Sequence, residues 1–362
     1  MSLDTSQNGR PVNNLAKAAY ILIILAISLY LIQVGRNFLI PLVLAFMTWG
    51  LLNELTKQIM RIGTRGFSPP RWLATLLSIS VLGLFFLGIY QLLASQSEAL
   101  AAAGPVYQEN FSRLLDGLMV WAGIEQLPST DSMFQSINIG SMLSLVGGSV
   151  GSVFTSIVLV VIYTAFLFTE QRIIPLKLDA LHSNDEGAKQ TDRVFTEIAT
   201  QVQRYVWMKT LVSLLTGVLS YVVLKLVGVD FAAVWALLIF LLNYIPNVGS
   251  FLGVVFPALL TLVQFDTLTP FLLITVGLGA VQFIVGNVVE PAFMGKSLNL
   301  SAFMIVLSLT FWGMLWGIPG MFLSVPIMVT TVIICSRFES LRGFAIILSA
   351  DGVLQEAGTE KE

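Results

Sequence analysis

The chain has 362 residues and a net charge of -2; 56% of its residues are hydrophobic and only 11% are charged, against roughly 25% in a soluble domain. This composition excludes an ordinary soluble domain and indicates an integral membrane protein. Because the sequence has no block of basic residues, nucleic acid is not an expected partner.

Hydrophobic runs give the plan of the fold, because about 20 helical residues cross a bilayer core about 30 Å thick. Runs identified by their lack of charge lie near residues 15–35, 38–55, 72–94, 147–169, 206–227, 231–265, 267–289 and 297–336. They predict an all-α polytopic membrane protein with about eight hydrophobic runs, the first a retained span rather than a signal peptide. Two of them, 231–265 and 297–336, are too long for single straight spans.

Basic residues in the loops predict the orientation of the chain in the membrane. The loop after the second run contains Lys57, Arg61, Arg65 and Arg71 without an acid, so we expect it to be cytoplasmic. Counting spans from that loop places both termini in the cytoplasm and the acidic segment 95–146 on the outside.

Two connecting segments show the apolar periodicity of amphipathic helices. One stripe runs from Tyr107 to Met119 in the outer segment, and the other runs from Val194 to Tyr205 before the fifth span. We expect the outer helix to lie on the membrane surface, on a neighbouring subunit or on its own chain.

The predicted organisation is residues 1–94 (N-terminal tail and spans one to three), 95–146 (outer amphipathic segment), 147–230 (spans four and five, with a cytoplasmic helical segment at 170–205), 231–336 (a core with both interrupted segments) and 337–362 (a cytoplasmic tail).

Residues 241–253, LLNYIPNVGSFLG, interrupt the sixth run. Pro246 lacks a backbone donor and disfavours helix at the preceding residue, while Gly249 allows a turn. An unwound turn at membrane depth is tolerated only where protein or water surrounds it. The segment predicts a re-entrant helical hairpin or a tilted span with a proline kink, and a hairpin would make Asn243, Pro246, Asn247 and Gly249 candidates to line a pathway.

The eighth run is interrupted in a comparable way by GMLWGIPGMFLSVP, residues 313–326. Gly317, Pro319, Gly320 and Pro326 are candidate gate or hinge positions, because glycine and proline weaken a helix. Paired discontinuous helices late in a membrane chain are typical of a transporter's binding site, although proline and glycine also occur in ordinary membrane helices.

The seventh run places small and polar residues on one helical face, at Gly279, Gln282, Gly286 and Glu290. This face predicts either a pathway, with Gln282 and the nearby Asn287 as candidates, or a close contact between helices. Glu290 stands at the edge of the run. If it is buried, it is the candidate for proton coupling, because acids inside a membrane are usually functional.

Three stretches together resemble one family: NYIPNVGS at 243–250, NVVEPAFMGKSLNLS at 287–301 and GIPGMFLSVP at 317–326. They are similar to the signature stretches of the autoinducer-2 exporter family of bacterial inner-membrane proteins, and the likeness extends to the plan of hydrophobic runs. Ala302 departs from the proline often found there in the family. The resemblance implies an oligomeric secondary transporter, linked to export of autoinducer-2 and, in some branches, to sodium/proton antiport.

The sequence gives little support for catalysis, nucleotide binding or metal binding. GGSVG at 147–151 matches a nucleophile pattern around Ser149, but the chain's one histidine, His182, is expected beyond the other end of that span. No Walker A, HExxH or cysteine cluster occurs, and Cys335 is the single cysteine. We therefore expect no catalytic residue, no metal and no cofactor.

The function predicted from the residues and the resemblance is alternating-access export of a small polar molecule such as autoinducer-2. The segment 231–336 would be the transport core, with substrate near Asn243, Asn247 and Gln282. The expected partners are the lipid bilayer, a small-molecule substrate and further copies of this chain, in the bacterial inner membrane. A sodium/proton antiporter and a non-transporting membrane scaffold are the alternatives.

Overall fold

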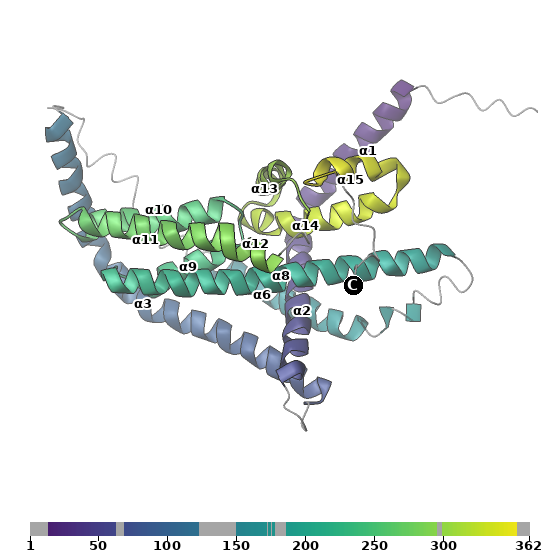
Figure 1. Ribbon diagram of the computed structural model, residues 1–362, viewed down its shortest axis with the longest axis horizontal. Coiled ribbons are helices and arrows are strands. Elements are labelled where there is room, and N and C mark those ends of the chain that lie inside the picture. The colour runs from purple at the N-terminus through teal and green to yellow at the C-terminus, as the bar shows by residue number, and fades with distance from the viewer. Residues whose placement is uncertain are drawn as a thin grey trace, which may run out of the picture.

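The computed structural model describes residues 14–62, 69–122, 150–171, 173–174, 176–177, 186–294 and 299–352. These residues form helices and no strand, apart from one isolated bridge between Leu300 and Ser349. The helices, shown in Figure 1, are α1 (Asn14–Val34), α2 (Arg36–Ile62), α3 (Arg71–Ala122), α6 (Val150–Glu170), α8 (Glu186–Val227), α9 (Ala232–Leu242), α10 (Val248–Gln264), α11 (Thr269–Ile284), a π-helical turn (Val285–Val289), α12 (Glu290–Met294), α13 (Ala302–Trp316), α14 (Ile318–Arg337), a 3₁₀ turn (Glu339–Leu341) and α15 (Arg342–Leu348).

Several helices are long and apolar enough to cross a membrane, which confirms the predicted all-α polytopic fold. Within the described ranges they cover Arg36–Arg61, Arg71–Gln96, Thr196–Val227, Thr269–Phe293 and Ile318–Arg337. Shorter apolar helices correspond to the remaining runs: Ala19–Val34, Ile157–Glu170, Ala232–Leu242, Val248–Gln264 and Ala302–Trp316. Many large apolar side chains on these helices are exposed, as expected for surfaces that face lipid rather than water.

Helix α8 is the centre of the arrangement. It packs against α2, α9, α11 and α14, and Figure 1 shows it lying alongside α9, α11 and α14 while α2 crosses it. Its continuity is expected, because the sequence from 186 to 227 contains no proline. One apolar cluster, around Val206 and Leu323, joins α8 to α14; a second, around Leu224, Ile239 and Leu278, joins α8 to α9 and α11.

Both interrupted segments are helical hairpins. In the first hairpin, α9 and α10 pack against each other around a turn at residues 243–247; in the second, α13 and α14 pack against each other and are separated by Gly317 alone. The second is also tied by Ser308 Oγ of α13, which donates to the backbone oxygen of Ser324 at 3.2 Å. The sequence left open a hairpin or a kinked span, and the structure has a hairpin in each place.

Helix α3 joins two predicted elements into one. The third span and the predicted outer helix form a single helix of 52 residues, about 78 Å long. Its outer part packs on its own chain: Tyr107 Oη donates to Asp230 Oδ2 at 2.7 Å, and Asn110 Nδ2 donates to Val263 O at 2.8 Å. Burial and the Asp230 carboxylate raise the pKa of Tyr107 above its ordinary value.

The first two predicted spans meet without a loop. The Gly35 N–H donates to Leu31 O at 2.8 Å and the Leu39 N–H donates to Gly35 O at 2.9 Å, so helical hydrogen bonding carries on through the junction. Figure 1 shows α1 extending beyond the end of α2 rather than folding back along it. The boundary between the first two runs is therefore a bend in a helix.

The first part of the predicted C-terminal tail is folded. Helix α15 packs on α14, with Ala345 and Leu348 buried. The backbone N–H of Ser301 donates to Leu348 O at 3.0 Å, and that of Ala350 donates to Asn299 O at 3.1 Å. These bonds hold the end of α15 against the entry to the second hairpin.

Candidate functional site

A stripe of buried polar side chains runs along α8. Lys209, Ser213, Thr216 and Ser220 recur at i, i+4, i+7 and i+11 and are all buried, so they lie on one face of the helix. Thr216 Oγ1 donates to Val212 O of its own helix, whereas Ser220 Oγ has no hydrogen-bond partner among the residues that the structure describes. Polar groups are costly to bury in a membrane protein, so this stripe marks α8 as one wall of a candidate site.

The tip of the first hairpin meets this stripe. Asn243 is 5% exposed, and its Nδ2 donates to Ser213 Oγ at 3.0 Å. One position along, Tyr244 Oη donates to Thr210 Oγ1 at 2.7 Å. Two neighbouring residues of the turn therefore hold the tip against α8 through side-chain hydrogen bonds.

The turn of the first hairpin depends on its glycine. A methyl group at Gly249 would lie 1.7 Å from Leu242 O, so the start of α10 passes directly against the end of α9. Pro246 precedes it, and Asn247 takes a φ of 60°, a conformation that asparagine adopts more readily than most residues. Asn247 is exposed and Pro246 is half-buried. Of the predicted tip residues, Asn243 and Gly249 are thus the buried ones.

Gln282 on α11 faces the first hairpin, next to Gly253 of α10 and Ile239 of α9. Its Nε2 lies 3.3 Å from where a methyl group at Gly253 would stand, and Ile239 of α9 flanks the same position. Gln282 is 9% exposed, and Nε2 has no hydrogen-bond partner within the described part of the chain. A buried amide nitrogen without a partner is uncommon, and it leaves its two N–H donors available to a bound molecule.

Glu290 forms an ion pair that the sequence did not predict. Lys209 Nζ donates to Glu290 Oε1 at 2.6 Å; the lysine side chain is 4% exposed and the glutamate 26% exposed. The fifth run was expected to be free of charge, and that expectation is wrong, because Lys209 and Lys225 lie within it. The signal that could have found Lys209 is a lone lysine inside VWMKTLVSLL, where an isolated charge is costly.

The seventh run does not keep the predicted face. The π-helical turn at Val285–Val289 changes the phase of the helix, so Gln282 is buried while Gly286 and Asn287 are exposed. Asn287 Nδ2 donates to Phe283 O of its own helix at 3.0 Å. Nothing lies within 4 Å of a methyl group placed at Gly279 or Gly286. The structure therefore brings Gln282 and Glu290 to the site and leaves Asn287 outside it.

The second hairpin reaches the site through an aromatic contact. The rings of Tyr244 and Phe322 lie with centroids 4.6 Å apart, joining the tip of the first hairpin to α14. The two hairpins are therefore in direct contact beside α8.

The predicted gate residues of the second hairpin differ in burial. Gly317 forms its turn with a φ of 67°, and a methyl group at Gly320 would lie 1.9 Å from Trp312 O. Gly317 and Pro319 are exposed, whereas Gly320 and Pro326 are buried. The glycines thus permit the close turn, and Pro326 interrupts α14 within the core.

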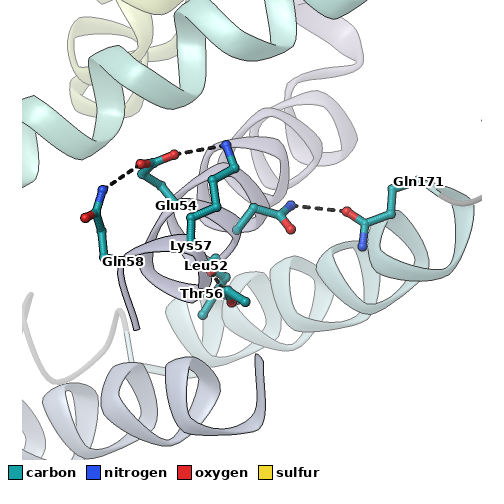
Figure 2. Close-up of polar contacts among 7 residues, drawn as sticks. Leu52, Glu54, Thr56, Lys57, Gln58 and Gln171 are labelled. Atoms are coloured by element: carbon teal, nitrogen blue, oxygen red, sulfur yellow. Dashed lines mark hydrogen bonds and ion pairs between the residues drawn. The ribbon is translucent and has the colours of Figure 1, made fainter. Parts of the chain in front are cut away.

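A second polar cluster lies at the far end of α2 and is separate from this site. Figure 2 shows Glu54 between Lys57 and Gln58: Lys57 Nζ donates to it at 3.0 Å and Gln58 Nε2 at 2.9 Å. Gln171 comes from the end of α6 and accepts from Asn53 Nδ2 at 3.2 Å and from Trp49 Nε1 at 2.9 Å. Glu54 is therefore satisfied by its own helix.

The described residues give no support for a catalytic site or a metal site. They contain no group of three or more histidine, cysteine, aspartate or glutamate side chains that could hold a metal. Ser149 and His182, the residues of the weak nucleophile pattern, lie outside the described ranges.

Comparison with known proteins places most of the helical region within one family. The sequence model of AI-2E family transporters matches residues 20–339. The AI-2 transport protein TqsA of Escherichia coli K12 is 29% identical over 340 residues, covering 92% of this chain and 95% of that protein. The putative transport protein YhhT of the same strain is 30% identical over 324 residues, covering 86% and 87%. A putative transport protein of Borreliella burgdorferi is 35% identical over 201 residues, 55% of each chain.

Proposed function

Because this chain belongs to the AI-2E transporter family, we propose that it is a secondary transporter that exports a small, neutral, polar molecule such as autoinducer-2. The observation that carries the proposal is the buried amide pair beside the first hairpin. Asn243 bonds to α8, while Gln282 presents an Nε2 donor without a partner among the described residues. Amides donate and accept hydrogen bonds without net charge, which suits a neutral polyhydroxylated molecule.

The stripe on α8 extends this site along the helix. Ser213 and Ser220 supply hydroxyl groups on the same face, and Ser220 Oγ is unpartnered within the described residues. A substrate that bonds to Gln282 Nε2 and Ser220 Oγ would supply the partners that these two atoms lack among the described residues. Its binding would therefore offset part of the desolvation cost of burying these polar groups.

The first hairpin is the moving element in this proposal. α9 is 11 residues long, about 16 Å, which is roughly half of a bilayer core. A hairpin of this reach would enter the membrane from one side and end within it. Its tip is held by the side-chain bonds of Asn243 and Tyr244 and by the contact with Phe322, so exchanging these few bonds would open one side of the site.

The second hairpin would act with the first in alternating access. Gly317 and Gly320 form its close turn, and Pro319 lies in the first turn of α14. Pro326 removes one backbone hydrogen bond from the buried part of that helix, which makes it the hinge candidate. The Tyr244–Phe322 contact would transmit a movement of either tip to the other hairpin.

The test is flux through the purified protein in proteoliposomes, with labelled autoinducer-2 and an imposed pH gradient. We expect saturable flux that Gln282→Leu and Asn243→Ala reduce at least tenfold and that Asn287→Ala leaves near the wild-type rate, because Asn287 bonds only to its own helix. Absence of saturable flux at any gradient would contradict the exporter assignment.

A sodium/proton antiporter is the second candidate, and the Lys209–Glu290 pair is the observation that favours it. A sodium gradient applied to the same vesicles, with internal pH as the readout, separates the two. Sodium-dependent proton movement without signal flux would support the antiporter. A scaffold without transport activity would tolerate Asn243→Ala and Gln282→Leu in every assay.

The proposal includes an inner-membrane location with a cytoplasmic C-terminus and assembly of several copies of the chain. The exposed apolar side chains of α1, Tyr20 and Leu22 among them, suit contact with lipid or with a second copy. Cysteine accessibility from each side of the membrane tests the orientation, and native mass spectrometry of the detergent-solubilised protein tests the assembly.

A further inference from the structure

Lys209 and Glu290 form the most deeply placed ion pair within the described part of the chain. The lysine side chain is 4% exposed, whereas the basic partners of the other recorded pairs are 26% to 66% exposed. A buried ammonium is tolerated only with a counter-charge and hydrogen bonds. Glu290 therefore offsets the cost of burying the Lys209 ammonium, and removing its negative charge leaves that cost uncompensated.

Glu290 reaches Lys209 because of the π-helical turn. In a regular α-helix, eight residues from Gln282 to Glu290 would rotate the side chain about 80° away from the face of Gln282. The backbone N–H of Glu290 instead bonds to Val285 O, five residues back, and this wider turn returns Glu290 toward α8. Single π-helical turns are frequent at functional sites, and here one lies between the candidate substrate residue and the ion pair.

The surroundings of the pair connect it to the first hairpin. Tyr205, one turn before Lys209 on α8, interacts electrostatically with both Glu290 and Tyr244. Tyr244 in turn bonds to Thr210, the residue after Lys209. On α14, Arg337 pairs with Glu197, and on α2, Glu54 pairs with Lys57, while Arg36 and Arg61 lie at the two ends of α2. Among the described residues, Tyr205 is therefore the titratable group recorded beside Glu290, and Tyr244 of the hairpin tip lies beyond it.

We propose that Lys209 and Glu290 form the proton-binding site that couples transport to the proton gradient. This inference rests on the proposed transporter function. Glu290 takes one proton from water and becomes a neutral carboxyl group, so the net charge of the pair rises from zero to +1. The buried ammonium of Lys209 then lacks its counter-charge, and this cost favours the rearrangement that frees the hairpin tip. Release of the proton on the other side restores the pair, so one proton moves inward as one substrate molecule leaves.

The experiment compares flux of labelled autoinducer-2 with and without a pH gradient in proteoliposomes. Glu290→Gln should lower the gradient-dependent flux at least tenfold. This variant also leaves Lys209 buried without a counter-charge, so it is prone to misfold. The double variant Lys209→Met/Glu290→Gln removes both charges, and it should fold stably while its flux no longer responds to the gradient. A merely structural ion pair would leave the double variant with the wild-type response, and that result would overturn the proposal.

Glu197→Gln is the matched control. Glu197 is 23% exposed, close to the 26% of Glu290, and pairs with Arg337. Its neutralisation should leave the dependence of flux on the pH gradient unchanged. If Glu197→Gln removes that dependence as fully as the double variant does, the effect is not specific to Lys209 and Glu290, and the proposal is wrong.

A second readout does not require transport. Infrared difference spectra of the purified protein between acidic and alkaline pH should contain a protonated carboxyl band that Glu290→Gln removes and Glu197→Gln leaves in place. If this band is present while the wild type carries no flux, the exporter function fails and the proton site stands. If the wild type carries flux that ignores the pH gradient, or the band survives Glu290→Gln, the proton site fails.

Discussion

Asn243 at the end of α9 and Ser213 in the middle of α8 are joined by a hydrogen bond of 3.0 Å between two buried side chains. The bond fixes the tip of the first hairpin beside the polar stripe of α8. Removing either partner leaves the other buried without a partner.

Asn243→Ala should lower the free energy of unfolding by about 1–3 kcal/mol, because it leaves Ser213 Oγ unpaired in the core. Chemical unfolding of the purified protein in detergent measures this. The matched control is Asn287→Ala, which removes only an exposed bond to its own helix and should change stability by less than about 0.5 kcal/mol. Equal losses in the two variants would show that the Asn243–Ser213 bond does not hold the tip.

Gln282→Leu should separate stability from function. The side chain is buried and its Nε2 is unpartnered among the described residues, so an apolar residue of similar size should be neutral or stabilise by about 1 kcal/mol. Flux should nevertheless fall at least tenfold. Thermal unfolding together with vesicle flux measures both quantities.

The control for Gln282 is Gln264, whose side-chain nitrogen and oxygen are both hydrogen-bonded. Its Nε2 donates to Gly228 O at 2.9 Å and its Oε1 accepts from the Asp230 N–H at 2.9 Å. Gln264→Leu removes both bonds and should destabilise by about 2 kcal/mol. If Gln282→Leu destabilises as strongly as Gln264→Leu, Gln282 has a structural role that the geometry does not reveal.

Gly249→Ala should prevent the first hairpin from closing. Its methyl group would lie 1.7 Å from Leu242 O, and backbone atoms on both sides must move to relieve the overlap. We expect a loss of about 3 kcal/mol or more, at the upper end for overpacking, seen as a lower Tm or as loss of the folded protein. Gly279→Ala, which meets open space, should be neutral or stabilise by up to about 1 kcal/mol. A normal Tm for Gly249→Ala would rule out the close approach of α9 and α10.

Tyr107 should remain protonated at a pH where an ordinary tyrosine, with a pKa of about 10, is half ionised. Burial, the hydrogen bond to Asp230 and the charge of Asp230 all raise the Tyr107 pKa. Because the folded-state pKa lies above the unfolded one, the stabilisation from neutral Tyr107 is complete below about pH 10 and is lost as the pH rises toward the folded-state value.

Ultraviolet titration measures the Tyr107 pKa as the difference between the wild type and Tyr107→Phe. Asp230→Asn should bring ionisation to lower pH, because it removes the negative charge beside the phenol. An unchanged titration in Asp230→Asn would show that burial alone sets the pKa.

Local patterns in the sequence predicted the helices of this protein and the break within the sixth run. Hydrophobic runs predicted the helices, and Pro246 with the glycines around it predicted the break in the sixth run, because backbone geometry and burial in lipid depend mainly on the residues themselves. Asn243, Gln282 and Glu290 were also singled out as polar residues within or at the edge of apolar runs, and in the structure the first two are buried and Glu290 is half-buried. Their roles in transport stay proposals.

What the sequence by itself determined is therefore the helical membrane fold and the positions where its helices break. Only the tertiary structure decided which polar groups meet. Lys209 and Glu290 lie 81 positions apart and Asn243 and Ser213 lie 30 apart, so no local pattern pairs them, and the π-helical turn moved Glu290 onto α8 while leaving Asn287 exposed. The reason is physical: helix formation is decided within a few turns of chain, whereas the partner of a buried charge is set by how the helices pack.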